Sequence, residues 1–262
     1  MSSVLSIVGV RILSSGLAVA FYSGSRGGTG KTTLSLLTSL LISAIEVPKR
    51  PSVLFIDLGY EVNSATYILF SRIVPPTYVD LVKADEVDLC EYRINLNGKE
   101  SRLYFVSCSD VLVTDDILLK LRHVLPVLKK EFDLVVLDFP SSVSKYHHEL
   151  ATSCDVVVLV SDCSELTVKY VTKLPIPGDR YVVAVLNKYR KEFLDLKLKL
   201  GEVFPVVYTV SFESSLELLG QGLQYFLKFG RLSKQFSQDL VNLCKFIYDI
   251  RRSCRYVYRL CR

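Results

Sequence analysis

Seven short runs of apolar, largely β-branched residues recur along the chain, and they constrain its fold more than any other feature. They are continuously apolar rather than alternating, which is typical of parallel strands buried on both faces of a sheet. Helical stretches separate the runs, so strand and helix are expected in series. The runs lie at residues 16–23, 52–58, 102–108, 133–139, 155–162, 180–187 and 204–210.

This alternation predicts an α/β fold with a doubly wound, mostly parallel sheet and helices on both faces. The chain has 262 residues and no long linker or repeat, so we expect a single domain over residues 1–262. Residues 1–15 are interpreted as an extra strand rather than a signal peptide, because Arg11 interrupts their apolar run. Asn97 and Gly98 predict a hairpin turn.

The seven cysteines lie far apart and form no C-x-x-C pair, so the sequence indicates neither a zinc site nor a redox motif. No apolar run reaches the eighteen or so residues that a membrane-spanning helix needs. These features favour a cytoplasmic protein with reduced cysteines.

The segment Ser23–Thr33, SGSRGGTGKTT, lies between the first apolar run and a leucine-rich helical stretch. It departs from the common phosphate-loop pattern G-x-x-x-x-G-K-[ST], because Ser25 stands where the first glycine belongs and Gly24 is one place too early. Backbone N–H groups of such a loop close around phosphates, the lysine reaches the β and γ phosphates, and the hydroxyl after it ligates magnesium. The candidate phosphate-binding residues are Gly27, Gly28, Thr29, Gly30, Lys31, Thr32 and Thr33.

Polar residues that follow the other apolar runs are the next candidates, because ligands bind outside the carboxyl ends of the strands in this kind of sheet. Asp138 ends the run 133–139 at the position where P-loop proteins hold magnesium, and Asp57 is placed similarly. Both also fit a plain turn or helix-cap aspartate. Asn187 ends the run 180–187, and its amide offers a donor and an acceptor to an adenine edge.

Together these motifs resemble the deviant Walker A ATPases of the ParA/MinD family, in which the loop has the pattern K-G-G-x-G-K-[ST]. Arg26 stands in the place of the first lysine. The resemblance extends to about Gly222, through VLFIDLGYEVNSATYIL, FDLVVLDFPSS and VLNKY. It implies ATP and Mg²⁺ as ligands, with Thr32, Asp138 and Asp57 at the metal.

The resemblance also implies that Arg26 reaches the nucleotide of a partner subunit in an ATP-dependent homodimer, and it gives catalytic roles to Lys31, Arg26 and Asp57. One departure concerns hydrolysis, because the family's water-positioning aspartate is replaced by Gly59. Glu61 lies two residues further along the chain and could replace this aspartate only from a displaced position. A displacement of a catalytic group by about 1 Å already lowers the rate ~100-fold. The resemblance therefore implies a weak ATPase.

The C-terminal segment is basic, with nine Lys and Arg from Lys228 onward against two Asp. Residues 240–262 predict an amphipathic helix that carries Arg251, Arg255 and Arg259 on one face. Docking of the apolar face on its own domain would leave the basic face for phosphates, so these arginines are candidate DNA contacts. A membrane-surface helix is disfavoured because the last twelve residues contain a single Leu and no Phe or Trp.

We therefore expect a ParA-like switch that binds DNA without sequence preference and takes part in DNA or plasmid segregation or positioning. The segment with Asn63 and Thr66 favours this branch of the family. A centromere-binding or activator protein is a further expected partner. Two alternatives stay open: a MinD-like positioning ATPase at a membrane, and an ATP-binding scaffold that hydrolyses little.

Overall fold

The structure is a computed structural model that describes residues 16–46, 49–60, 63–83, 87–96, 99–110, 114–141, 143–217, 222–229 and 232–260, the last nine of these by their backbone alone. The predicted N-terminal strand at residues 1–15 lies outside the described residues, as do Glu61 and the Asn97-Gly98 turn. Within the described part, no helix is long and apolar enough to cross a membrane.

Among the described residues, eight strands form one sheet in the order β3-β4-β2-β5-β1-β6-β7-β8. Every neighbouring pair is parallel except β3 and β4, which form the predicted antiparallel hairpin. All seven predicted strands are present, and the predicted doubly wound sheet is confirmed. The strands are β1 (Leu17–Tyr22), β2 (Val53–Asp57), β3 (Glu91–Leu96), β4 (Lys99–Val106), β5 (Leu134–Asp138), β6 (Val156–Ser161), β7 (Tyr181–Tyr189) and β8 (Val207–Ser211).

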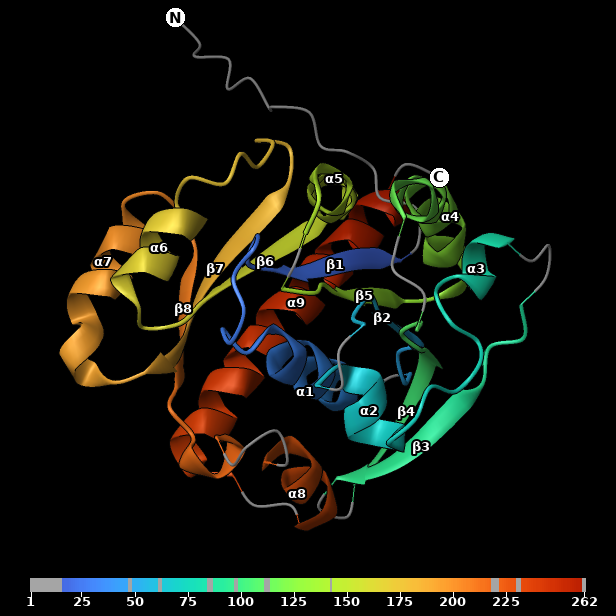
Figure 1. Cartoon of the computed structure of the whole chain (residues 1–262), viewed down its shortest axis with the longest axis horizontal. Helices are drawn as coiled ribbons and strands as arrows, with labels where there is room; N and C mark the ends of the chain where they lie inside the picture. Colours follow the sequence, from blue (N-terminus) through green and yellow to red (C-terminus); the bar gives the residue numbers. More distant parts are fainter. Residues whose placement is uncertain are drawn as a thin grey trace, which may run out of the picture.

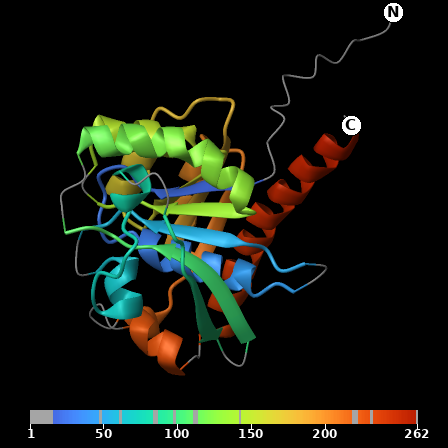
Figure 2. The ribbon, with the colours of Figure 1, turned by 90° about the vertical axis from the view of Figure 1, so that its right-hand side faces the viewer.

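Helices cover both faces of the sheet, as Figures 1 and 2 show. One face packs against α1 (Lys31–Ser43), α2 (Ala65–Phe70), α8 (Gly222–Phe229) and α9 (Lys234–Leu260). The other packs against α4 (Asp115–Glu131), α5 (Lys145–Ser153), α6 (Glu165–Val171) and α7 (Leu194–Gly201), with α3 (Asp80–Lys83) beside them. Short 3-10 turns lie at Lys191–Phe193 and Ser214–Leu216.

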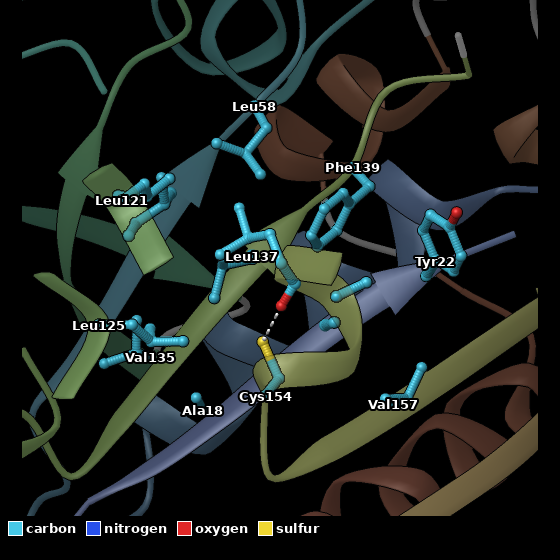
Figure 3. Packing of buried hydrophobic residues seen from close by; sticks show 14 of the residues in the cluster. Ala18, Tyr22, Leu58, Leu121, Leu125, Val135, Leu137, Phe139, Cys154 and Val157 are labelled. Carbon is cyan, nitrogen blue, oxygen red and sulfur yellow. Dashed lines mark hydrogen bonds between the residues drawn. The ribbon is translucent and has the colours of Figure 1, made fainter. Parts of the chain in front are cut away.

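The central strands are buried on both faces, which explains their continuously apolar sequences. Every residue of β1, β2, β5 and β6 is buried. Figure 3 shows Val135 and Leu137 of β5 together with Leu121 and Leu125 of α4 in the core of one face. Burial of side chains of this size stabilises a fold by about 1.5–3 kcal/mol each. The core therefore fixes the strand ends that carry the polar residues.

The amphipathic helix predicted at residues 240–262 forms within the longer α9, and its apolar face docks on the protein's own sheet. The buried stripe consists of Phe236, Leu240, Leu243, Cys244 and Ile247, and it packs against the β8 side of the sheet and against α1. Figure 2 shows α9 in red, running diagonally along this face. The part of the apolar face whose side chains the structure describes, up to Ile247, is thus used inside the domain.

The prediction that Arg251 contacts DNA is wrong, because the structure buries this residue. It lies four residues after Ile247 on the docked stripe and is only 6% exposed. Its Nη2 pairs with Asp133 Oδ1 at 2.5 Å, just before β5. Arg251 is therefore a structural residue and not part of an open basic face. The side chains of Arg255 and Arg259 lie outside the described part of the structure, so their predicted contacts with DNA stay a prediction.

Candidate functional site

The loop between β1 and α1 lies at the carboxyl end of the central strand, and a buried lysine holds it together. Lys31, the first residue of α1, is 6% exposed. Its Nζ donates to Ser23 Oγ at 2.9 Å and to the Arg26 carbonyl at 2.8 Å. The Ser23 hydroxyl also donates to that carbonyl, at 2.7 Å. The loop is folded around its cation, with the ammonium group pointing into it.

This loop opens onto a cavity of about 350 Å³. The cavity brings together residues that the sequence placed at four separate strand ends. Arg26 is not among the residues that line it, and its side chain lies over the ring of Tyr170 instead. The predicted site residues that line the cavity are Gly27, Gly28, Thr29, Gly30, Lys31, Thr32, Thr33, Asp57, Asp138 and Asn187.

Two buried carboxyl groups lie side by side at the bottom of the cavity, because Asp57 and Asp138 end neighbouring parallel strands in register. Asp57 is fully buried and accepts three hydrogen bonds: from Gly59 N at 2.9 Å, Thr66 N at 2.7 Å and Thr66 Oγ1 at 2.6 Å. Burial raises the pKa of Asp57, and these hydrogen bonds oppose that rise. Asp57 thus fixes the turn between β2 and α2.

Asp138 differs from Asp57, because its Oδ1 is buried and makes no hydrogen bond within the described structure. Burial, and then the charge of Asp57, raise the pKa of Asp138 to about 7. The nearby Thr32 hydroxyl and the Lys31 ammonium oppose this rise. An unsatisfied buried carboxylate oxygen beside a second carboxylate is suited to a divalent cation, which would supply the missing partner.

A metal at this place would need oxygen atoms from elsewhere as well. In the part of the chain that the structure describes, no group of three or more His, Cys, Asp or Glu side chains could hold a metal. The donor set fits Mg²⁺, which binds through one or two carboxylates, a hydroxyl, water and phosphate oxygens. The site therefore suits a metal that arrives with a phosphate ligand.

Asn187 reaches the loop itself. Its Nδ2 donates to the Thr29 carbonyl at 2.8 Å, and the residue is only 6% exposed. The predicted contact with an adenine edge is not tested by the structure, whereas the contact with the loop is a role that the sequence did not indicate. This hydrogen bond joins the end of β7 to the phosphate loop.

The cavity is also lined by residues that the sequence analysis missed. Phe212, Leu216 and Phe236 supply apolar side chains to the lining, and Lys188, which also lines the cavity, pairs with Glu217 at 2.7 Å. Apolar side chains with a few polar groups among them suit a nucleotide base. Ser211 and Phe212 come directly after the run 204–210. The rule that ligands bind outside the carboxyl ends of the strands, which indicated Asp57 and Asp138, could therefore have indicated these residues as well.

Gly59 lies directly against the carboxylate of Asp57. A Cβ atom added at this position would come within 2.8 Å of Asp57 Oδ1 and within 2.8 Å of Ser64 Cβ. Both distances are too short for nonbonded atoms. Any larger residue at position 59, including the aspartate of the family pattern, would therefore require Asp57 or Ser64 to shift.

A parallel sheet with a lysine-containing loop between its central strand and α1, and with an aspartate at the end of the adjacent β5, defines a P-loop nucleotide-binding protein. The chain belongs to the AAA domain family, whose model matches residues 18–176. The resemblance to the ParA/MinD family is thereby confirmed. No curated protein matches the chain in sequence.

Solved structures of similar fold include two that contain a nucleotide and one that contains DNA. The septum site-determining protein MinD from Pyrococcus horikoshii, complexed with Mg-ADP, is 17% identical with a TM-score of 0.65, over 88% of this chain and 96% of that one. A variant of McdA from Cyanothece in complex with ATP is 17% identical with a TM-score of 0.62, over 90% and 97%. The pNOB8 ParA bound to nonspecific DNA is 13% identical with a TM-score of 0.62, over 91% and 99%. At these identities the likeness concerns the fold.

Proposed function

We propose that the protein is an ATP-dependent dimeric switch that binds DNA without sequence preference and acts in the segregation or positioning of DNA. The observation that carries this proposal is the distribution of two cations around one cavity. Lys31 is buried inside the phosphate loop, whereas Arg26 lies outside the cavity lining. These positions support a role for Lys31 at the nucleotide of its own subunit and a role for Arg26 elsewhere.

Nucleotide binding follows from the loop. Lys31 would exchange its hydrogen bonds to Ser23 and the Arg26 carbonyl for phosphate oxygens. Thr32 and Asp138 would hold Mg²⁺, with Asp57 beside them, and Mg²⁺ supplies positive charge that neutralises the phosphates. The MinD and McdA structures with Mg-ADP and ATP support this assignment.

A homodimer follows from Arg26 if its guanidinium meets the partner's nucleotide. Arg26→Ala should then leave the affinity for ADP nearly unchanged and abolish ATP-dependent dimerisation, measured by calorimetry and analytical ultracentrifugation. An equal loss of ADP affinity would show that Arg26 acts on its own subunit's nucleotide and would refute the proposal. Lys120→Ala is a matched control, because it removes one exposed positive charge on α4, on the other face of the sheet.

The DNA surface is assigned to Arg255 and Arg259, since Arg251 is buried in its ion pair. The apolar stripe of α9 through Ile247 is buried in the domain and is unavailable to a bilayer. ParA bound to nonspecific DNA supports the same choice. We therefore expect co-sedimentation with DNA, and not with anionic liposomes, when ATP and Mg²⁺ are present.

The salt dependence of DNA binding tests this surface directly. Arg255→Ala with Arg259→Ala should lower the log-log salt slope by roughly 0.9 for each phosphate that the protein no longer binds, equally for unrelated DNA sequences. Lys120→Ala with Lys130→Ala makes the same change in charge on α4 and should leave the slope unchanged. Tail-dependent binding to anionic liposomes, with DNA binding insensitive to both arginines, would favour the membrane alternative instead.

A second candidate function is an ATP-binding scaffold with little hydrolysis, and the packing at Gly59 favours it. No carboxylate can occupy position 59 without a shift of Asp57 or Ser64. Asp57 itself is held by three hydrogen bonds to the turn. Single-turnover measurement of phosphate release separates the two candidates: a dimer that persists long after ATP addition without phosphate release would identify the scaffold.

A further inference from the structure

A tyrosine on α6 contacts the part of the loop where the chain departs from the common phosphate-loop pattern. Tyr170 lies on the helix that follows β6, and Figure 1 shows α6 beside the loop that joins β1 to α1. The Tyr170 hydroxyl accepts a hydrogen bond from Ser25 N at 3.3 Å. Its ring lies under the Arg26 guanidinium, with Cζ 4.9 Å from the ring centroid.

Gly24 belongs to the same contact. It has a φ of +56°, and a Cβ atom at this position would collide with Cε1 and the hydroxyl of the Tyr170 ring. The Tyr170 ring occupies the space that a side chain at position 24 would need. This contact explains why a glycine stands at position 24, one place earlier than in the common pattern. Three consecutive loop residues, Gly24, Ser25 and Arg26, are shaped around one aromatic ring.

The main chain of Arg26 is held at the same time. Its carbonyl accepts hydrogen bonds from Ser23 Oγ and Lys31 Nζ. Among the described residues, no carboxylate forms an ion pair with its guanidinium, and the Tyr170 ring is the group that lies against it. A guanidinium over an aromatic face is attracted by the negative ring surface. The Arg26 side chain is therefore held against the Tyr170 ring of its own subunit.

We propose that Tyr170 restrains Arg26 in the single subunit, so that dimerisation with ATP must first release the arginine from the ring. This proposal rests on the proposed function, in which Arg26 binds the partner's nucleotide. A partner that requires one conformation of a side chain binds with an apparent affinity equal to its intrinsic affinity multiplied by the fraction of molecules in that conformation. Tyr170 is a positioning residue that acts through Arg26 and sets the dimer affinity.

The size of the restraint follows from the contact. One cation–π contact at a partly exposed site changes an equilibrium by a factor of about 2.3 to 5.4. A symmetric dimer releases two such contacts, so their removal should tighten the dimer by about 5- to 30-fold. Structural damage to the loop would act in the opposite direction, because it would weaken nucleotide binding and dimerisation together.

The test compares Tyr170→Leu with Tyr170→Phe in the full chain. Tyr170→Leu removes the ring, and the ATP-dependent dimer should become about 5- to 30-fold tighter in analytical ultracentrifugation. Tyr170→Phe keeps the ring and removes the hydrogen bond from Ser25 N, so its dimer affinity should stay within about twofold of the wild type. The ADP affinity of both variants should match the wild type, because Arg26 does not line the cavity.

A second measurement examines the contact without dimerisation. In the nucleotide-free protein, NMR of labelled arginine should show ring-current shifts at the Arg26 side chain that disappear in Tyr170→Leu and persist in Tyr170→Phe. Absence of these shifts in the wild type would overturn the proposal. A Tyr170→Leu dimer that is unchanged or weaker would overturn it too, and would leave the dimeric switch intact. A wild type that stays monomeric with ATP would overturn both.

Discussion

Gly59→Asp tests whether the missing carboxylate is what slows hydrolysis, and the structure predicts that the substitution has a cost. The new Cβ would lie within 2.8 Å of both Asp57 Oδ1 and Ser64 Cβ. Asp57 cannot move freely, because its oxygens hold Gly59 N and both donors of Thr66. Ser64 is the residue before the first turn of α2. One of these buried groups has to shift.

Overpacking of this kind costs about 1–3 kcal/mol. For a chain of this size, 1 kcal/mol corresponds to roughly 2–4 °C in Tm, so Gly59→Asp should melt roughly 2–12 °C below the wild type. Gly59→Ala is the matched control, because it introduces the same Cβ without the carboxylate. The two variants should lose similar stability in calorimetry.

Hydrolysis then separates the two variants. A well-placed general base contributes about 10²–10⁴-fold, and a displacement of about 1 Å removes ~100-fold of this. We therefore expect Gly59→Asp to release phosphate about tenfold faster than Gly59→Ala when ATP and Mg²⁺ are saturating. If Gly59→Ala has the same Tm as the wild type, the steric argument about position 59 is refuted. If Gly59→Asp releases phosphate no faster than Gly59→Ala, the carboxylate at position 59 has no catalytic role, and Glu61 becomes the residue to mutate.

Three further predictions concern charges in the structure. Lys31→Ala should abolish ATP binding in calorimetry, and an unchanged affinity would contradict the phosphate-loop assignment. Burial raises the pKa of Asp138 from 3.8 to about 7, so its buried charge destabilises the metal-free protein above about pH 7, and this cost disappears as the pH falls through 7 toward 4. The free energy of unfolding of the wild type should therefore rise by a few kcal/mol from pH 8 to pH 5 relative to Asp138→Asn, and parallel pH profiles would contradict this. Arg251→Met should cost about 3 kcal/mol because it removes the ion-pair partner of the Asp133 carboxylate, which keeps only its hydrogen bonds, such as that from Ser52 N. A Tm equal to the wild type would show that the ion pair contributes nothing.

Most of the fold could be predicted from the sequence because parallel strands buried on both faces leave a strong local signal. Each of the seven apolar runs became a strand, and polar residues that follow them line one cavity. The glycines and Lys31 of the loop carry a pattern set by phosphate chemistry. These features depend on neighbours in sequence, and sequence patterns record such neighbours well.

The features that were missed depend on partners far away in the chain. Arg251 begins a row of arginines at helical spacing, and nothing local shows that Asp133 lies opposite it. The hydrogen bonds of Asp57 to Thr66 and the ring of Tyr170 beneath Arg26 are likewise contacts between separate elements. Tertiary contacts of this kind decide whether a charged side chain is free or engaged.

The strand order also has a consequence for the synthesis of the chain. β1 precedes every other strand in the described sheet, yet its two neighbours are made much later, since Leu17 pairs with Leu134 and Val19 with Val156. Until the ribosome has delivered β5 and β6, an almost wholly apolar strand has no hydrogen-bonding partner, and pairing over such separations is slow. The Arg251–Asp133 ion pair can form only after α9 has been synthesised. Nascent chains that end before α9 should therefore be bound by chaperones.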